Sequence, residues 1–111
     1  MKDCIFCKIS RQQIKTEFIF KDRDVVVLKD INPKAEIHLL IVPKRHIESI
    51  NYLRSKDKEL AGKMLLTAKK IARIAGASSG SKLIFNVGQG GGQIIDHLHL
   101  HLLSGKIRGE V

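Results

Sequence analysis

The pattern of apolar and polar positions divides the chain into several short strands and one long helix. Two β-branched and aromatic runs, at 17–20 and 25–28, are joined by a short polar connection and predict a β-hairpin. A turn is expected at 30–33, because proline fixes its own φ and disfavours helix in the residue before it. The run at 37–42 is almost wholly apolar and predicts a central strand.

A helical period replaces the strand pattern between Ser55 and Ala75. Apolar residues recur there at three- and four-residue steps, and most of the lysines fall between them, which predicts one amphipathic helix. Ser55 suits the N-cap of this helix, and Gly76 suits its C-terminal stop. A shorter helical turn is expected at 4–10.

Two further strands, at 83–87 and 96–103, flank a glycine-rich loop at 88–92. Because the strands do not alternate regularly with helices, the pattern favours an α+β fold built on an antiparallel sheet. The predicted sheet has five strands and is accompanied by one long helix. A length of 111 residues is typical of one domain, so we expect a single domain over 1–111.

Composition and charge exclude only a few classes of binding partner. The chain is 43% hydrophobic and 28% charged, as soluble globular domains are, and it lacks an apolar stretch long enough for a membrane span or signal peptide. We therefore expect a cytoplasmic protein with no membrane partner. The net charge of +9 favours phosphorylated or acidic partners. Basic residues are concentrated between Arg54 and Arg73 without interleaved aromatics, so a solvated helix face is a better interpretation than a nucleic-acid interface.

The last predicted strand carries the strongest candidate chemistry, in the alternating segment 97–103, HLHLHLL. Alternation places the three histidines on one face and the leucines on the other. The histidine face is either open to solvent, a three-histidine metal site, or a set of residues with different roles. On a straight strand His97 and His101 are about 13 Å apart, whereas a zinc–nitrogen bond is about 2 Å long. The spacing therefore favours different roles, and the glycine-rich loop just before the segment suits a phosphate, since glycines let backbone N–H groups approach an anion.

Cys4 and Cys7 have the C-x₂-C spacing of a metal or redox site. In a cytosolic protein such a pair is less often a structural disulfide. A thioredoxin-like redox pair would require a βαβ context, which the pattern lacks. Zinc ligation, which would need two more ligands, and two unligated thiols remain as interpretations.

In these residues the chain resembles the histidine triad (HIT) family, most closely its Hint branch of nucleoside phosphoramidases. The family signature, His-φ-His-φ-His-φ-φ with φ apolar, is met by residues 97–103. Agreement extends along almost the whole chain. The other matching positions are Ile5-Phe6, Lys8-Ile9, Asp30-Ile31, Pro33, Ala35, His38, Pro43-Lys44, His46-Ile47, Asn86, Gly92-Gln93 and Leu102-Leu103-Ser104-Gly105.

The resemblance implies a nucleotide hydrolase that acts on purine nucleoside 5′-phosphoramidates or aminoacyl adenylates. His99 would attack the α-phosphorus and carry the nucleotidyl group, which water would then release as the nucleoside monophosphate. The resemblance also implies a homodimer. The groups expected to hold the phosphate oxygens are His101, His38, Asn86 and the loop residues Gly92, Gln93 and Ile94.

For the nucleoside, the resemblance implies a carboxylate and an apolar slot. Asp30 would accept hydrogen bonds from the ribose hydroxyls. The residues expected to line the base slot are Ile5, Phe6, Ile9, Leu28 and Ile31.

Many bacterial members of the family complete the cysteine pair with two histidines, which on this chain are His46 and His97. A Cys₂His₂ set is closed and tetrahedral, as structural zinc sites are. The resemblance thus implies a structural zinc ion that takes no part in the chemistry.

Two positions depart from the Hint pattern. Ile94 stands where a serine or threonine commonly helps the leaving group, and Asp96 stands where an aromatic residue is usual. By alternation Asp96 should face away from the histidines. Two alternatives therefore stay open, a dinucleoside polyphosphate hydrolase and a zinc-stabilised nucleotide-binding module with little catalysis.

Overall fold

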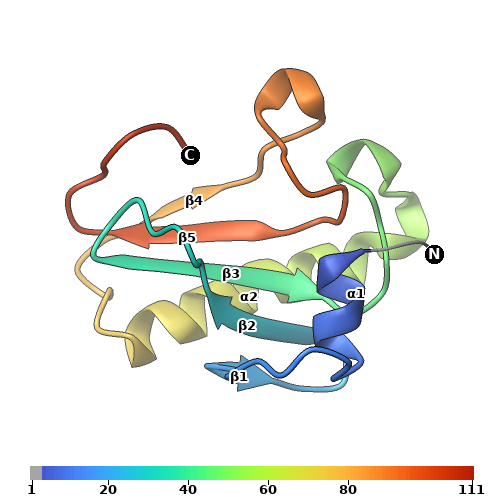
Figure 1. Ribbon diagram of the computed structural model, residues 1–111, viewed down its shortest axis with the longest axis horizontal. Helices are drawn as coiled ribbons and strands as arrows, with labels where there is room; N and C mark the ends of the chain where they lie inside the picture. Colours follow the sequence, from blue (N-terminus) through green and yellow to red (C-terminus); the bar gives the residue numbers. More distant parts are fainter. Residues whose placement is uncertain (1–3) are drawn as a thin grey trace.

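The described part of the computed structural model, residues 4–111, forms one antiparallel sheet of five strands with a long helix packed on one face and a short helix on the other (Figure 1). The strand order is β1-β2-β3-β5-β4. In chain order the elements are α1 (Ile5–Ser10), β1 (Phe20–Lys21), β2 (Val25–Lys29), β3 (Ile37–Pro43), α2 (Lys58–Ile74), β4 (Lys82–Ile84) and β5 (Leu100–Ser104), with 3-10 turns at Ile50–Tyr52, Ser55–Asp57 and Gln89–Gly91. The α+β fold with its single long helix is confirmed.

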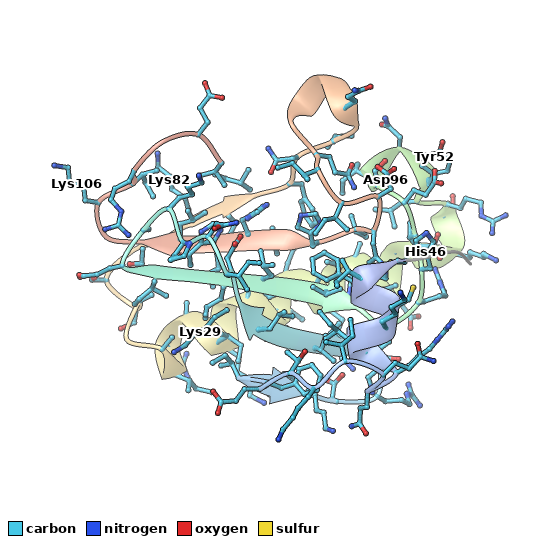
Figure 2. All side chains as sticks on the ribbon, in the orientation of Figure 1. Lys29, His46, Tyr52, Lys82, Asp96 and Lys106 are labelled. Atoms are coloured by element: carbon cyan, nitrogen blue, oxygen red, sulfur yellow. The ribbon has the colours of Figure 1, made fainter. Side chains whose placement is uncertain are left out.

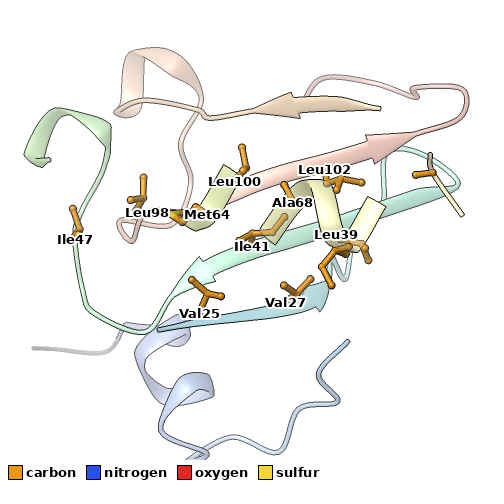
Figure 3. Close-up of a cluster of buried hydrophobic side chains, with 12 residues drawn as sticks. Val25, Val27, Leu39, Ile41, Ile47, Met64, Ala68, Leu98, Leu100 and Leu102 are labelled. Carbon is orange, nitrogen blue, oxygen red and sulfur yellow. The ribbon is translucent and has the colours of Figure 1, made fainter. Parts of the chain in front are cut away.

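The two central strands are apolar on both faces because both faces are covered. One face packs against α2, whose Met64, Ala68 and Ile71 recur at helical spacing and are fully buried (Figure 3). The other face packs against α1 through Phe6 and Ile9. This double cover explains why β2 and β3 lack the polar alternation of a half-exposed sheet.

Helical structure begins at Ser55, as expected, but as a 3-10 turn that leads into α2. The expectation that Ser55 caps the long helix is wrong, because the buried carboxylate of Asp57 organises this corner. It accepts the Arg54 backbone N–H at 2.9 Å and pairs with the Arg45 guanidinium. Gly76 ends the helix as predicted, with a φ of +85°. Within the described residues, no helix has the length and hydrophobicity that crossing a bilayer requires.

The outer strands are shorter than the pattern predicts. β1 pairs with β2 only at Phe20 and Lys21, and β4 ends at Ile84, three residues before the expected end. The most consequential difference is at β5, which was expected over 96–103 but begins at Leu100. Residues 97–99 are therefore outside the sheet ladder, and their backbone is available for other partners.

Candidate active site and metal centre

The segment from His97 to His101 joins two groups of polar side chains. The first, called here the metal cluster, consists of Cys4, Cys7, His46 and His97. The second, called here the histidine cluster, consists of Asp30, His38, His99 and His101. Alternation persists through the segment although only part of it is strand, since Leu98, Leu100 and Leu102 all join the core under α2.

In the metal cluster the four ligand atoms converge. Cys4 Sγ lies 3.2 Å from His97 Nδ1, Cys7 Sγ lies 3.3 Å from His46 Nδ1, and the two Nδ1 atoms are 3.1 Å apart. Around one zinc ion, with sulfur at about 2.3 Å and nitrogen at about 2.0 Å, tetrahedral neighbours lie roughly 3.3–3.6 Å apart. The observed spacing therefore fits a tetrahedral metal ion.

The protonation state of His97 also suits a ligand. Its Nε2 lies 2.8 Å from the Pro43 carbonyl oxygen. A carbonyl can only accept, so Nε2 carries the hydrogen and Nδ1 presents its lone pair to the cluster. Burial lowers the pKa of His97 to about 4, which keeps the ring neutral. Burial, together with Cys4, raises the pKa of the Cys7 thiol to about 11, a value that a bound cation would reduce.

Helix α1 brings the cysteines to the histidines. Cys4 is its N-cap residue, and its Sγ accepts the Cys7 N–H at 3.4 Å, so both thiols lie on one side of the first turn. The Phe6 ring between them packs edge-on against His97 and His99, with centroids 5.6 and 5.1 Å away. Helix α1 and its N-cap residue therefore carry both cysteines of the metal cluster, and the helix also packs against His99 through Phe6.

His99 is held in the tautomer that a nucleophile requires. Its Nδ1 lies 2.7 Å from the His97 carbonyl oxygen, so Nδ1 carries the hydrogen and Nε2 retains its lone pair. Burial lowers the pKa of His99, which favours the neutral ring. The arrangement leaves a neutral imidazole nitrogen able to attack an electrophile.

His38 and His101 form a hydrogen-bonded chain beside His99. The sheet register sets His38 opposite Leu103, one diagonal step from His101. The Lys34 N–H donates to His38 Nδ1 at 2.9 Å, so His38 Nε2 carries the hydrogen and donates to His101 Nδ1 at 2.9 Å. His101 must then carry its own hydrogen on Nε2, and its ring centroid is 5.0 Å from that of His99.

Burial and neighbouring charges keep the two hydrogen-bonded rings, His38 and His101, neutral. Burial, with the neighbouring His99 and His38, lowers the pKa of His101 to about 4, and burial lowers that of His38. Asp30 Oδ2 lies 3.3 Å from His38 Nε2 and opposes that shift. Asp30, His38 and His101 also lie close enough together to hold a cation, but the hydrogen bond between the two rings occupies the atoms that would bind it.

The glycine-rich loop is closed by its own hydrogen bonds. Gly88 and Gly92 have φ values of +70° and +84°, which glycine adopts without strain. Of the amides expected to face phosphate, the Gly92 N–H donates to the Gln89 carbonyl at 3.0 Å, whereas no described residue accepts the Ile94 N–H. The Ile94 side chain is 93% exposed. The Ile94 amide is thus the available donor of the pair.

The two amide side chains predicted to contact substrate are both bonded to the chain itself. Asn86 Nδ2 donates to the carbonyl oxygens of Gly91 and Val111, each at 2.9 Å. Gln93 is buried and bonds through both of its polar atoms. Both amide side chains therefore hold the backbone of the glycine-rich loop by hydrogen bonds.

The predicted base-slot residues separate into two groups. Phe6, Ile9 and Leu28 belong to one buried cluster on the α1 face of the sheet. Ile5 and Ile31 lie at the surface, 40% and 90% exposed. Sequence reasoning missed the other apolar members of the cluster, which are Val26, Leu40 and Val42, with Cys4, Ile14, Phe18 and Ile95 at its margin. The continuous apolar runs of β2 and β3 were the available signal, because such runs are buried on both faces of a sheet.

Asp96 is exposed and lies near Tyr52 at the surface (Figure 2), away from the buried histidines. The sequence also gave no sign of three backbone groups that set the histidine tautomers, the Lys34 N–H and the Pro43 and His97 carbonyls.

Comparisons with known proteins cover nearly the whole chain. A family model described as "Scavenger mRNA decapping enzyme C-term binding" matches residues 3–111. Protein HitA of Neisseria gonorrhoeae is 42% identical over 103 residues, which are 93% of this chain and 96% of HitA. The structure of a HIT family hydrolase from Legionella pneumophila covers 94% of both chains at 46% identity, with a TM-score of 0.91. A histidine triad protein from Clostridium difficile also gives a TM-score of 0.91, at 36% identity over 100% of this chain and 97% of its own.

Proposed function

The chain belongs to the histidine triad family of hydrolases, and from that premise we propose that it cleaves the α-phosphate bond of purine nucleoside 5′-phosphoramidates or aminoacyl adenylates. One observation carries the proposal. The His97 carbonyl holds His99 with a free lone pair on Nε2, while the His38 side chain holds neighbouring His101 with its N–H outward. A nucleophile and a hydrogen-bond donor for a negatively charged oxygen thus stand side by side.

The reaction would proceed in two displacements at phosphorus. With a phosphoramidate, His99 Nε2 forms a bond to the α-phosphorus while the bond to the leaving amine breaks, and the amine takes up a proton from solvent; an aminoacyl adenylate would release its amino acid as the carboxylate at this step. Water then attacks the same phosphorus, the bond to Nε2 breaks, and a proton returns to solvent. The products are the amine, the nucleoside monophosphate and the free imidazole, while the His101 N–H stabilises the phosphate oxygens in both steps.

Substrate binding would use the groups that remain available around His99. The Ile94 N–H would donate a hydrogen bond to a phosphate oxygen. Asp30 would accept hydrogen bonds from the ribose, and its half-buried position beside His38 supports that role. The base would lie near Phe6, which already contacts the His99 ring. Because Ile94 supplies no hydroxyl, the leaving group would depend on solvent for its proton.

The metal cluster suits a structural zinc ion bound by Cys4, Cys7, His46 and His97. All four ligands come from the protein, which leaves no open position for substrate. When bound, the ion would fix α1 against the segment that carries His99. The spacing of the ligand atoms and the tautomer of His97 support this assignment.

We also propose a cytoplasmic homodimer. β4 is an edge strand of three residues whose Leu83 is 45% exposed, and α2 carries two exposed leucines, Leu65 and Leu66. Edge strands and exposed apolar side chains are features that a second copy of the chain would cover. Sedimentation of the purified protein would measure the assembly directly, and a monomer at micromolar concentration would contradict it.

The function is tested by comparing turnover of an AMP–amine conjugate with that of diadenosine tri- and tetraphosphate. We expect the conjugate to be the better substrate, and mass spectrometry after alkaline quench to find a nucleotidyl group on His99. Faster cleavage of the diadenosine compounds would favour the polyphosphate hydrolase instead. Binding of AMP with neither turnover nor adduct would favour a nucleotide-binding module.

A further inference from the structure

Gln93 lies 8% exposed at the end of the glycine-rich loop, and every polar atom of its side chain is bonded to backbone. Its Oε1 accepts the Gly88 N–H at 2.9 Å. Its Nε2 donates to the carbonyl oxygens of Glu48 and Ile95, at 2.7 and 2.9 Å. A carboxamide has two N–H donors, and both are used here. The side chain is therefore committed to the fold and does not face a ligand.

These bonds join two segments that are far apart in the sequence. Residues 43–48, which leave β3, run beside residues 93–98, which approach β5 (Figure 1). His46 and His97, one from each segment, meet in the metal cluster. The hydrogen bonds between the segments are His97 Nε2 to the Pro43 oxygen at 2.8 Å, Leu98 N to the Ile47 oxygen at 2.6 Å and Gln93 Nε2 to the Glu48 oxygen at 2.7 Å.

At its other end Gln93 sets the shape of the glycine-rich loop. The Gly88 N–H donates to the Gln93 side chain, and the Gln93 N–H donates to the Gly88 carbonyl at 3.1 Å. The two residues thus close the loop with a reciprocal pair of hydrogen bonds. Gly88 has a φ of +70°, which glycine adopts readily, and the two hydrogen bonds restrain it in that conformation.

We propose that Gln93 is a positioning residue that transmits the state of the metal cluster to the glycine-rich loop. A metal ion bound by His46 and His97 holds segment 43–48 against segment 93–98, and this fixes the Glu48 carbonyl. Glu48 then orients the Gln93 carboxamide, which holds Gly88. This proposal rests on the proposed function only in taking the loop as the phosphate site, because the coupling is a property of the fold.

Coupling between two sites is reciprocal. If the metal ion orders the loop through Gln93, breaking the loop's bond to Gln93 must weaken metal binding by the same factor. A residue that only contacted substrate would leave the metal affinity unchanged. The two interpretations therefore differ in a measurement that requires no nucleotide.

The experiment measures hydrogen exchange of the Gly88 amide by NMR, in zinc-loaded protein and after chelation. In the wild type we expect zinc to slow this exchange about tenfold, within the usual range of coupling between sites. Gln93→Glu places a carboxylate against two carbonyl oxygens. Repulsion from these oxygens should break the link to Glu48, so that Gly88 exchange no longer responds to zinc and the zinc affinity is about tenfold lower.

Two further variants serve as controls. Gln89→Glu makes the same chemical change at an exposed position of the same loop and should behave as the wild type. Gln93→Met keeps the side-chain volume without the hydrogen bonds and should behave as Gln93→Glu. The proposal is overturned if Gly88 exchange in the wild type does not respond to zinc, a result that needs no variant to fold, or if zinc still slows Gly88 exchange in both Gln93 variants as much as in the wild type. None of these readouts depends on turnover, so failure of the hydrolase reaction would be recognised separately.

Discussion

His97 and His99 are two residues apart, both buried, and both lie against the ring of Phe6, yet the backbone prepares them for opposite tasks. The His97 Nε2–H donates a hydrogen bond to the Pro43 carbonyl, so the Nδ1 lone pair points into the metal cluster. The His99 Nδ1–H donates a hydrogen bond to the His97 carbonyl, so the Nε2 lone pair remains available. In each case a carbonyl selects which nitrogen can act.

The two clusters also differ in the arrangement of their polar atoms. In the metal cluster the donor atoms converge on one point, with 3.1 Å between the two ring nitrogens. In the histidine cluster the bonds run head to tail, from the Lys34 N–H through His38 to His101, and end on an outward N–H. Convergent lone pairs bind a cation, whereas an ordered chain of donors binds an anion. Two neighbouring clusters that both contain histidines therefore present opposite faces, lone pairs in one and an N–H donor in the other.

The largest effect is expected from His99→Ala, which removes the proposed nucleophile and none of the four residues of the metal cluster. Turnover of an AMP–amine conjugate should fall at least about 1,000-fold, as loss of a nucleophile does in other hydrolases. The zinc content should stay at the wild-type level, because His99 contributes nothing to the metal cluster. Steady-state kinetics and metal analysis on one preparation check both halves. Activity within tenfold of the wild type would remove His99 from the mechanism.

The converse change is Cys7→Ser, which removes a metal ligand and leaves the histidine cluster intact. Zinc affinity should fall by more than about 100-fold. Loss of a residue that only supports a ligand costs up to about 100-fold, and loss of the ligand itself should cost more. The melting temperature should no longer rise when zinc is added, since binding to the native state is what stabilises it. Competition with a chromophoric chelator measures the affinity. Ser10→Ala on the same helix is the control, and equal zinc affinity in both variants would contradict the assignment.

The sequence predicted the interior of this fold better than its edges. β2 and β3 agree with the pattern to within one residue at each end, because their apolar runs are buried on both faces. β1 and β4 were predicted too long, since the length of an edge strand depends on how far its single neighbour pairs with it. Local pattern contains no information about that neighbour.

The candidate site was also predicted only in part, because local pattern contains no information about contacts with distant segments. Alternation correctly assigned Leu98, Leu100 and Leu102 to the core. It could not show that residues 97–99 leave the sheet, because that depends on Leu98 donating to the Ile47 carbonyl from a distant part of the chain. Backbone groups that orient the rings have no residue type to recognise, so sequence reasoning named the histidines but not what directs them.

A smaller effect should follow from changing His38, which acts through His101. His38→Ala removes the donor that fixes the His101 tautomer, and kcat should fall about 100-fold, at the low end for proton-transfer groups. His38→Gln retains an N–H donor of similar reach and should recover part of the loss, with KM little changed. Equal kcat in the two variants would show that the donor is not what His38 contributes.

The smallest effect concerns stability as a function of pH. Burial, with His99 and His38 nearby, lowers the pKa of His101 to about 4, whereas an exposed histidine titrates near 6.5. Between these values the unfolded chain takes up a proton that the native state does not. The contribution is therefore complete above about pH 6.5 and is lost progressively as the pH falls to about 4. His101→Asn should remove it, so between pH 7.5 and 4.5 the melting temperature should fall by about 10 °C less than in the wild type. Calorimetry at fixed zinc concentration measures both slopes, and identical slopes would mean that His101 is not held neutral in the native state.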